Sequence, residues 1–311
     1  MPRSRGRINP PNMAARHAAH AARHADLHAA WAARTTFPPT YDCTDLCTPI
    51  KDQSQCGSCW DFSGVCVVEA ANIKAKNLPD NSAASQLSEQ YTLDACDGQN
   101  GGCGGDDNTT VLADAKTGGL PLTSVYGPYT AKEGACKLHQ LAGVARKNAG
   151  GVLYTLSDWG YVGPQTGVPT VDQIKAAMLQ YGPIGAAVAA DNAFESYQPG
   201  SVFQDSKSQD IDHDIVLVGW DDARRAWKLR NSWGTAWGNE GYMWIAYAAN
   251  MVGYESVWGV AGTPILPVPV PPAPTPPPTP GPAPRPWCHP KAAAVARHLV
   301  LAISELVRSD E

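Results

Sequence analysis

Two cysteines spaced two residues apart, Cys56 and Cys59, are the first residues along the chain whose types and spacing could do chemistry. A structural zinc site needs a second pair of ligands at short spacing, and no pair in the sequence matches. A thioredoxin-like redox pair needs a surrounding βαβ pattern, which is missing here. A third interpretation makes Cys56 structural and Cys59 a nucleophile on the first turn of a helix, where the helix dipole and free N–H groups favour the thiolate.

A nucleophilic thiol needs a base, and the middle of the chain contains two histidines, His139 and His213. His139 lies in a polar, lysine-bearing stretch, which favours a surface position. His213 begins an apolar run over 213–220 that predicts a strand, and the end of a strand is a rigid mount for an imidazole. A histidine that is satisfied by backbone groups is the alternative, and these residues alone leave it open.

A third group must orient the imidazole, and Asn231 follows His213 by 18 residues at the end of the next expected strand. Its amide oxygen can accept the imidazole N–H without adding a charge. The indole of Trp233 can exclude water from that hydrogen bond. An asparagine followed closely by a tryptophan is weak evidence by itself.

Helices and strands of ordinary length are expected to position these residues. Hydrophobic spacing predicts helices over 58–75 and 171–181. Apolar runs predict strands over 184–190, 213–220, 226–229 and 242–247. The first half of the domain is therefore helix-led and the second half strand-led, and a cleft commonly forms where two such parts meet.

Composition divides the 311 residues into four parts. Residues 1–36 are rich in Ala, His and Arg and carry a charge of about +5, whereas residues 37–263 carry about −11 and are long enough for a core. Residues 264–287 contain 13 of the 27 prolines and predict a polyproline II linker. Residues 288–311 predict a short amphipathic helix. The net charge of −5 argues against a nucleic-acid partner, and no apolar run is long enough to span a membrane.

Four separate motifs, in the order Gln, Cys, His, Asn, resemble those of the papain family of cysteine peptidases. They occupy 53–60, 87–90, 212–213 and 231–242, and the resemblance covers about 37–263. Residues 51–53 and 219–222 are more similar to the bacterial-type branch of that family. The resemblance implies an α+β, papain-like fold with a helix-led N-terminal lobe, a β-barrel-like C-terminal lobe and an active site in the cleft between them.

The resemblance also implies a role for each matching residue. Cys59 would be the nucleophile and His213 its base, the two resting as a thiolate–imidazolium pair. Asn231 would orient the imidazole, and Trp233 would shield their hydrogen bond. The Gln53 side chain would form the oxyanion hole with the backbone N–H of Cys59. The implied activity is that of a cysteine endopeptidase acting through an acyl-enzyme thioester, and neither a metal nor a cofactor is expected.

The remaining cysteines are assigned from their positions in the family pattern. The pairs expected to form disulfides are Cys56–Cys103 and Cys96–Cys136. A local Cys43–Cys47 bridge is left open. Cys66 is expected to be a buried small hydrophobe, and Cys288 to be free or intermolecular.

Six residues are expected to contact the substrate: Gly104, Gly105, Ala187, Ile211, Asp212 and Trp233. The two glycines would pair with an extended substrate through their backbones, and Asp106 would add charge at the rim. Ala187, Ile211 and part of 257–261 would line the pocket for P2, the second residue before the scissile bond. Such a lining favours an apolar P2 residue, as in cathepsin L-like members.

The first 36 residues are expected to be a short prosegment or a targeting segment. They lack the apolar core of a secretory signal peptide, although two disulfides imply an oxidising compartment. We therefore expect a secreted or lytic location, with leaderless export, a transit peptide or a misassigned start as ways to resolve the conflict. Four histidines at helical spacing predict a short basic helix that inhibits the acidic domain, with a metal-binding face as the other interpretation: His17, His20, His24 and His28. Their titration below about pH 6.5 would alter that contact.

Protein or peptide substrates are the expected partners, and the C-terminal helix is a candidate for binding an unknown partner. One rival function is a catalytically silent scaffold that keeps the fold and binds through the proline-rich linker. The complete set of Gln53, Cys59, His213 and Asn231 weighs against it. Another rival is an acyl-transferring relative with the same nucleophile, which the sequence does not separate from a peptidase.

Overall fold

The computed structural model describes residues 5–96, 100–137, 151–205 and 208–267. The chain divides into two compact units, Met1–Pro269 and Val270–Glu311, and all described residues belong to the first. Most of the expected proline-rich linker and all of the expected C-terminal helix lie outside the described residues, as does His139. Among the described residues, no helix has the length and apolar character needed to cross a bilayer.

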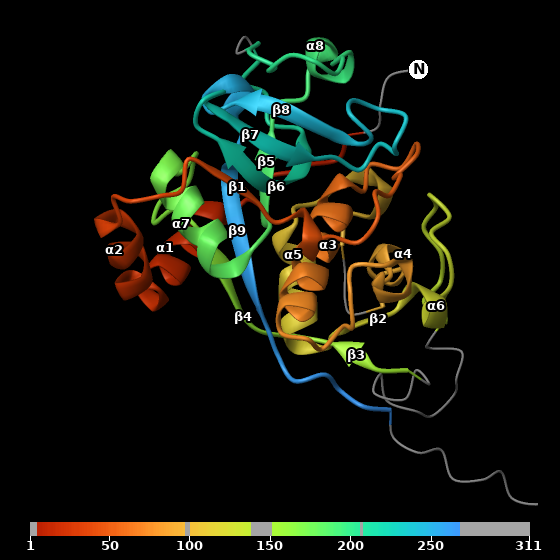
Figure 1. The fold of residues 1–311 in the computed structure, drawn as a ribbon. Helices are drawn as coiled ribbons and strands as arrows, with labels where there is room; N and C mark the ends of the chain where they lie inside the picture. Colours follow the sequence, from red (N-terminus) through yellow and green to blue (C-terminus); the bar gives the residue numbers. More distant parts are fainter. Residues whose placement is uncertain (1–4, 97–99, 138–150, 206–207, 268–311) are drawn as a thin grey trace, which may run out of the picture. The chain divides into compact units, whose positions relative to one another are not determined.

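The helix-led lobe is built around α3 (Cys59–Lys74), drawn in orange beside α5 (Thr109–Thr117) in Figure 1. Residues 59–72 of α3 are all buried, as expected for a helix that is covered on every side. The smaller elements of this lobe are α4 (Glu89–Leu93), α6 (Thr123–Tyr126), β2 (Leu120–Pro121) and β3 (Leu153–Tyr154). The nucleophile candidate Cys59 is thus the first residue of the central helix.

The strand-led lobe contains an antiparallel sheet with the order β4-β9-β5-β6-β7-β8, and β1 pairs with β6 off this path. The strands are β1 (Thr40–Asp42), β4 (Leu156–Tyr161), β5 (Ile184–Val188), β6 (His213–Asp221), β7 (Ala226–Arg230), β8 (Tyr242–Ala246) and β9 (Tyr254–Ala261). This lobe also carries α7 (Val171–Tyr181) and the short α8 (Asn192–Glu195). His213 is the first residue of β6, which has a neighbouring strand on each side.

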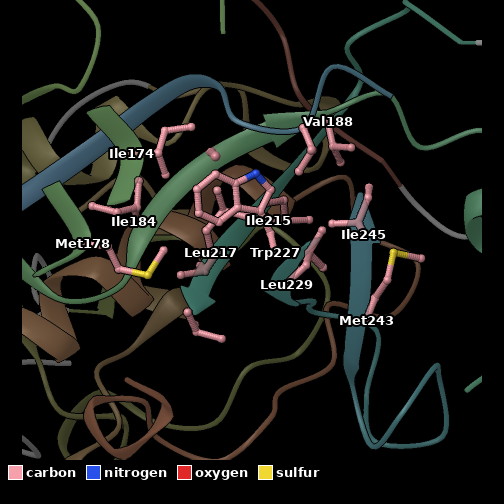
Figure 2. Close-up of a cluster of buried hydrophobic side chains, with 14 of the residues drawn as sticks. Ile174, Met178, Ile184, Val188, Ile215, Leu217, Trp227, Leu229, Met243 and Ile245 are labelled. Carbon is pink, nitrogen blue, oxygen red and sulfur yellow. The ribbon is translucent and has the colours of Figure 1, made fainter. Parts of the chain in front are cut away.

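Each lobe has a hydrophobic core of its own. Figure 2 shows the core of the strand-led lobe, where side chains from α7 meet side chains from four neighbouring strands. The strand residues are alternate positions, which share one face of a strand. Those labelled are Ile184, Val188, Ile215, Leu217, Trp227, Leu229, Met243 and Ile245. The sheet is thus fixed by buried side chains on the face that carries Ile215 and Leu217.

The two-lobed α+β architecture confirms the expected fold class. The helix expected over 58–75 is α3, and the one expected over 171–181 coincides with α7. The four expected strands correspond to β5, β6, β7 and β8, although β5 ends at Val188, two residues early. A single short helix was expected before the domain, but the structure has two: α1 (Met13–Arg23) and α2 (Ala25–Ala33).

The two N-terminal helices pack on the strand-led lobe, α1 against β4 and α2 against α7 (Figure 1). His24, between them, has the non-helical angles φ −115° and ψ 25°, so the helical hydrogen-bond pattern is interrupted there. The residues before α1 contact other parts of the chain. Gly6 bonds to Cys59, the first residue of α3, and Arg7 bonds to Asp212, which directly precedes β6. This short N-terminal stretch therefore reaches the place where the two lobes meet.

Candidate active site

The thiol of Cys59 lies at the N-terminus of α3, directly after the N-cap residue Ser58. The first backbone N–H groups of a helix have no partners within the helix and carry its positive dipole end. The N–H of Gly6 donates to the Cys59 Sγ at 3.2 Å, and the N–H of Asp214 also bonds to this sulfur. Since Asp214 follows His213 in β6, the start of α3 and the start of β6 meet at the thiol.

The imidazole of His213 is oriented by Asn231, whose Oδ1 lies 2.9 Å from the Nε2 of the ring. The indole of Trp233 stacks on the imidazole with ring centroids 4.6 Å apart. Both His213 and Trp233 are buried, so water is excluded from the His213–Asn231 hydrogen bond. The second ring nitrogen, Nδ1, has no hydrogen-bond partner among the described residues, which leaves it available to accept a proton.

The covered site favours the uncharged forms of both groups. Burial, followed by the charge of Asp214, raises the pKa of the Cys59 thiol to about 12, against the smaller opposing effect of the N–H groups of Asp214 and Gly6. Burial lowers the pKa of His213 to about 4. The thiolate–imidazolium pair implied by the resemblance therefore differs from this covered state, because no solvent stabilises the separated charges.

Gln53 is fully buried and contacts the loop that directly precedes Cys59. Its backbone N–H donates to the carbonyl of Ser232 at 2.8 Å, and its Oε1 accepts from the Ser232 hydroxyl at 2.6 Å. Its Nε2 donates to the carbonyl of Cys56 at 3.0 Å. These bonds hold the side-chain amide next to the loop that leads into α3 and tie it to the segment that carries Asn231.

The loop before Gln53 is anchored by Lys51, whose Nζ lies 2.7 Å from Glu69 Oε1 and also pairs with Glu89. Glu69 accepts two more hydrogen bonds, from the hydroxyl of Thr48 and the N–H of Leu87, each at 2.7 Å. The partners of Lys51 are buried in the helix-led lobe, and Lys51 itself is 13% exposed. This buried network fixes the position from which Gln53 reaches the site.

The structure contains the disulfides Cys56–Cys103 and Cys96–Cys136, the pairs that the family pattern implied. The first closes the loop directly before Cys59 onto the glycine-rich segment 101–105. Cys43, Cys47 and Cys66 are free and buried, so the Cys43–Cys47 bridge that was left open is not formed. Cys288 lies outside the described residues.

An extended N-terminal stretch, residues 5–8, crosses the site in front of Cys59. The N–H of Asp106 donates to the Gly6 carbonyl at 2.8 Å, and the N–H of Ile8 donates to the Asp106 carbonyl at 2.9 Å. The N–H of Arg7 donates to the Asp212 carbonyl at 3.0 Å. We call residues 5–8 the cleft strand, because its backbone is held from both lobes.

The side chains of the cleft strand are held by acidic groups. Arg5 forms ion pairs with Asp212 at 2.7 Å and Glu195 at 3.1 Å. Arg7 forms an ion pair with Asp214 at 2.8 Å in which both side chains are almost completely buried, at 1% and 0% exposure. Gly6, between the two arginines, fits so tightly that a Cβ would overlap the carbonyl oxygen of Gly57.

The four N-terminal histidines all face the strand-led lobe. His17 pairs with Glu255, the Nε2 of His24 lies 2.9 Å from Asp158, and that of His28 lies 3.0 Å from the carbonyl of Tyr161. The ring of His20 packs on Trp159 with centroids 4.2 Å apart. Within the described ranges, no cluster of three or more His, Cys, Asp or Glu side chains could hold a metal ion.

The residues expected to contact the substrate are brought near the site to different degrees. Ala187 pairs directly with Asp214 between β5 and β6, and Asp212 immediately precedes His213. Gly105 touches Gly6, but the backbone pairing to the cleft strand is made by Asp106 and not by Gly104 or Gly105. Ile211 directly precedes Asp212 and is partly buried.

Three acidic residues and the cleft strand itself were missed in the sequence. Asp214 is a charge at the second position of a strand that is buried along its length, which is a signal that could have been found. Asp107 and Glu255 carry no comparable local signal. The position of Gly6 against Cys59 depends on residues 53 apart in sequence, which no local pattern predicts.

Comparison with protein families and curated proteins gives a consistent result. A family model described as "Papain family cysteine protease" matches residues 37–261. Digestive cysteine proteinase 1 of Homarus americanus is 33% identical over 210 residues, 65% of this chain and 59% of that protein. Vignain of Phaseolus vulgaris is 34% identical over 244 residues, 75% of this chain and 60% of that protein. The chain thus spans about three fifths of the length of these relatives, which are eukaryotic and lend no support to a bacterial-type branch.

Solved structures share the fold. Digestive procathepsin L 3 of Tenebrio molitor superimposes with a TM-score of 0.60 at 24% identity, covering 73% of this chain and 71% of that one. Bromelain from Ananas comosus, solved in complex with the E64 inhibitor, gives a TM-score of 0.58 at 25% identity, covering 72% of this chain and 99% of that one.

Proposed function

The chain belongs to the papain family of cysteine proteases, and on this premise we propose that it is an endopeptidase that uses Cys59 as its nucleophile. The observation that carries the proposal is the His213–Asn231 hydrogen bond of 2.9 Å beneath the stacked Trp233, with the N–H of the next residue, Asp214, bonded to the Sγ of Cys59 at a helix N-terminus. A base that is oriented and shielded next to a thiol is the arrangement required for nucleophilic catalysis.

The proposed reaction proceeds in two halves. The Nδ1 of His213 takes the proton of the Cys59 thiol, and the sulfur attacks the scissile carbonyl carbon. The Gln53 amide and the backbone N–H of Cys59 stabilise the negative oxygen, an effect that is typically worth about 3 kcal/mol per donor. The imidazolium then protonates the leaving amine, and water, activated by the same imidazole, hydrolyses the thioester. Asn231 holds the ring in the orientation that both transfers need.

We further propose that the cleft strand inhibits the enzyme. Gly6 occupies the space in front of the Cys59 Sγ, and Arg5 and Arg7 hold the strand on either side. A substrate carbonyl has no access to the sulfur while Gly6 is in place. One of the fold neighbours is a procathepsin, which is in keeping with an inhibitory N-terminal segment.

Secretion or delivery to a lytic compartment is proposed on two grounds. The two disulfides are stable in an oxidising environment, and a relative's name describes a digestive enzyme. The domain limits of 37 and 263 and the placement in a bacterial-type branch remain predictions. The apolar P2 preference was expected from an apolar lining that includes Ala187 and Ile211, whereas the charged Asp214 stands opposite Ala187.

Labelling with a thiol-directed epoxide, followed by peptide mapping, tests the proposal on the full chain. We expect modification at Cys59 that is lost in Cys59→Ala and slowed in His213→Ala. The Gly6→Val variant, in which the cleft strand is displaced, should be labelled faster than the unaltered chain. Modification confined to Cys66 or Cys288 contradicts the proposal.

A further inference from the structure

The guanidinium of Arg7 fills a buried pocket immediately beside the nucleophile. Its neighbour Gly6 contacts the Cys59 Sγ, and its own N–H bonds to the carbonyl of Asp212, the residue before His213. Its Nη1 donates to the Oδ1 of Asp214 at 2.8 Å. In a chain bound along the cleft, the residue at the place of Gly6 faces the sulfur. The next residue, at the place of Arg7, puts its side chain into this pocket.

Asp214 forms the charged wall of this pocket. It stands directly opposite Ala187 in the β5–β6 ladder, and directly opposite residues of an antiparallel pair project from the same face. Ala187 is one of the residues expected to line the P2 pocket. The structure thus puts a carboxylate in the pocket for which the sequence predicted an apolar lining.

Two further carboxylates act on the same guanidinium. Burial alone would lower the pKa of Arg7, but Asp214, Asp107 and Glu255 outweigh it and raise the pKa overall. The Asp107 and Glu255 side chains are each held by a residue of α1: Arg16 lies 3.2 Å from Asp107, and His17 pairs with Glu255. The N-terminal segment therefore supplies one basic partner to each of three buried acids.

Displacement of the N-terminal segment removes all three basic partners at once. A buried carboxylate without a cation is costly, and burial already raises the pKa of Asp214 to about 7 although Arg7 is present. The Oδ2 of Asp214 has no hydrogen-bond partner among the described residues. A guanidinium can bind both oxygens of one carboxylate, which an ammonium cannot do with the same geometry.

We propose that the open pocket is an anionic specificity site that selects arginine as the P2 residue of the substrate, with Asp214 as the determinant. Arg7 is the intramolecular stand-in for that side chain. This inference rests on the proposed peptidase function and replaces the apolar preference expected from Ala187. An apolar P2 residue would leave Asp214 without the cation that Arg7 supplies in the covered state.

Two fluorogenic peptides that differ at P2 alone test the inference: acetyl-Ala-Arg-Gln and acetyl-Ala-Leu-Gln, each with a coumarin amide leaving group. The full chain is assayed with both, and the ratio of the two kcat/KM values is taken. This ratio is independent of the fraction of molecules in which the cleft strand has left the site. We expect arginine to be favoured about 10-fold or more, the usual effect of a hydrogen bond to a charged partner.

Substitution of the determinant should change that ratio. Asp214→Asn should lower the Arg/Leu ratio about 10- to 100-fold. The matched control Asp210→Asn alters an exposed acid four residues away and should leave the ratio unchanged. Because Asp214→Asn leaves Arg7 buried without its partner, the double variant Arg7→Gln with Asp214→Asn provides the same measurement without an unpaired buried cation.

The outcomes separate this inference from the function on which it rests. Cleavage with leucine favoured, or an Arg/Leu ratio that Asp214→Asn does not lower, overturns the anionic pocket and leaves the peptidase intact. If neither peptide is cleaved, the ratio is taken from the rates at which arginyl and leucyl epoxysuccinates label Cys59. Absence of both cleavage and labelling overturns the proposed function and this inference together.

Discussion

The backbone N–H of Gly6 donates a hydrogen bond to the Sγ of Cys59 at 3.2 Å. The nucleophile is thereby covered by a residue with no side chain, on a strand whose two arginines are paired with acids of the strand-led lobe. A larger residue cannot take this place, because any Cβ on Gly6 would overlap the Gly57 carbonyl. The proposed inhibition therefore depends on the fit of one glycine in front of the thiol.

Gly6→Val should activate the full chain. Forcing extra atoms into a filled site costs about 1–3 kcal/mol, so the ratio of covered to open molecules should fall by up to about 100-fold. Initial rates of peptide hydrolysis, measured before any processing of the chain, provide the test. Ile8→Ala is the control, because that side chain is 53% exposed and its truncation leaves the backbone bonds in place. Equal initial rates for Gly6→Val and the unaltered chain would contradict the inhibitory role of the cleft strand.

Asn231→Ala should lower kcat more than it raises KM. Without the Oδ1 acceptor, the His213 ring is no longer held for proton transfer, which typically contributes about 10²-fold or more. Steady-state kinetics on the full chain provide the measurement, and Asn239→Ala at an exposed position is the matched control. An effect on KM alone would assign Asn231 to substrate binding instead.

The attachment of α1 should weaken as the pH falls from about 6.5 to about 4. Burial, then the charges of Arg23, His24 and Arg16, lower the pKa of His20 to about 4, against the opposing charge of Asp158. Between pH 6.5 and 4, His20 therefore binds fewer protons when α1 is docked than when α1 is released. The docked state of α1 is thus most stable above pH 6.5, and it loses stability relative to the released state as the pH falls.

Burial would raise the pKa of Asp158, but its hydrogen bonds with Lys116 and His24 and the charge of Arg23 outweigh this and lower the pKa to about 2. Asp158 therefore remains charged throughout that range. Hydrogen exchange of residues 13–23, corrected for the intrinsic effect of pH, measures the attachment. In His20→Gln the protection of α1 should depend less on pH between 4 and 6.5. Identical pH profiles for the two proteins would show that His20 has no such effect.

Lys51→Met should destabilise the fold by about 3–5 kcal/mol, because it leaves two buried carboxylates, Glu69 and Glu89, without their cation. Urea unfolding gives the free energy of unfolding for each protein. Lys228→Met removes a more exposed ion pair with Asp42 and should cost about 1 kcal/mol or less. A smaller loss for Lys51→Met than for Lys228→Met would contradict a structural role for this network.

The sequence predicted well whatever depends on local patterns. The apolar spacing after Ser58 predicts α3, and the apolar run over 215–220 predicts most of β6, because burial on both faces demands such runs. The types of Cys59, His213 and Asn231 allow one chemistry, and the resemblance of their motifs to the papain family implies their roles.

The occupant of the cleft could not be predicted in the same way. Arg7 and Asp214 are 207 residues apart, and their pairing depends on the path of the whole N-terminal segment across both lobes. Net charge indicated only that a basic segment lies on an acidic domain. The charge of Asp214 in a buried strand was visible, but its meaning depended on knowing that Ala187 stands opposite.

The order of elements along the chain gives the N-terminal segment an unusual connection to the enzyme that it covers. The cleft strand comes first, α1 and α2 follow, and the chain then enters β1 at Thr40. A cut between Ile8 and Met13 would release the cleft strand, which would then be diluted into the surrounding solution. The two helices would remain covalently attached, at an effective concentration that no added peptide reaches easily. Arg16 and His17 would then stay beside Asp107 and Glu255. Cys59 would become accessible to substrate while α1 and α2 remained on the strand-led lobe.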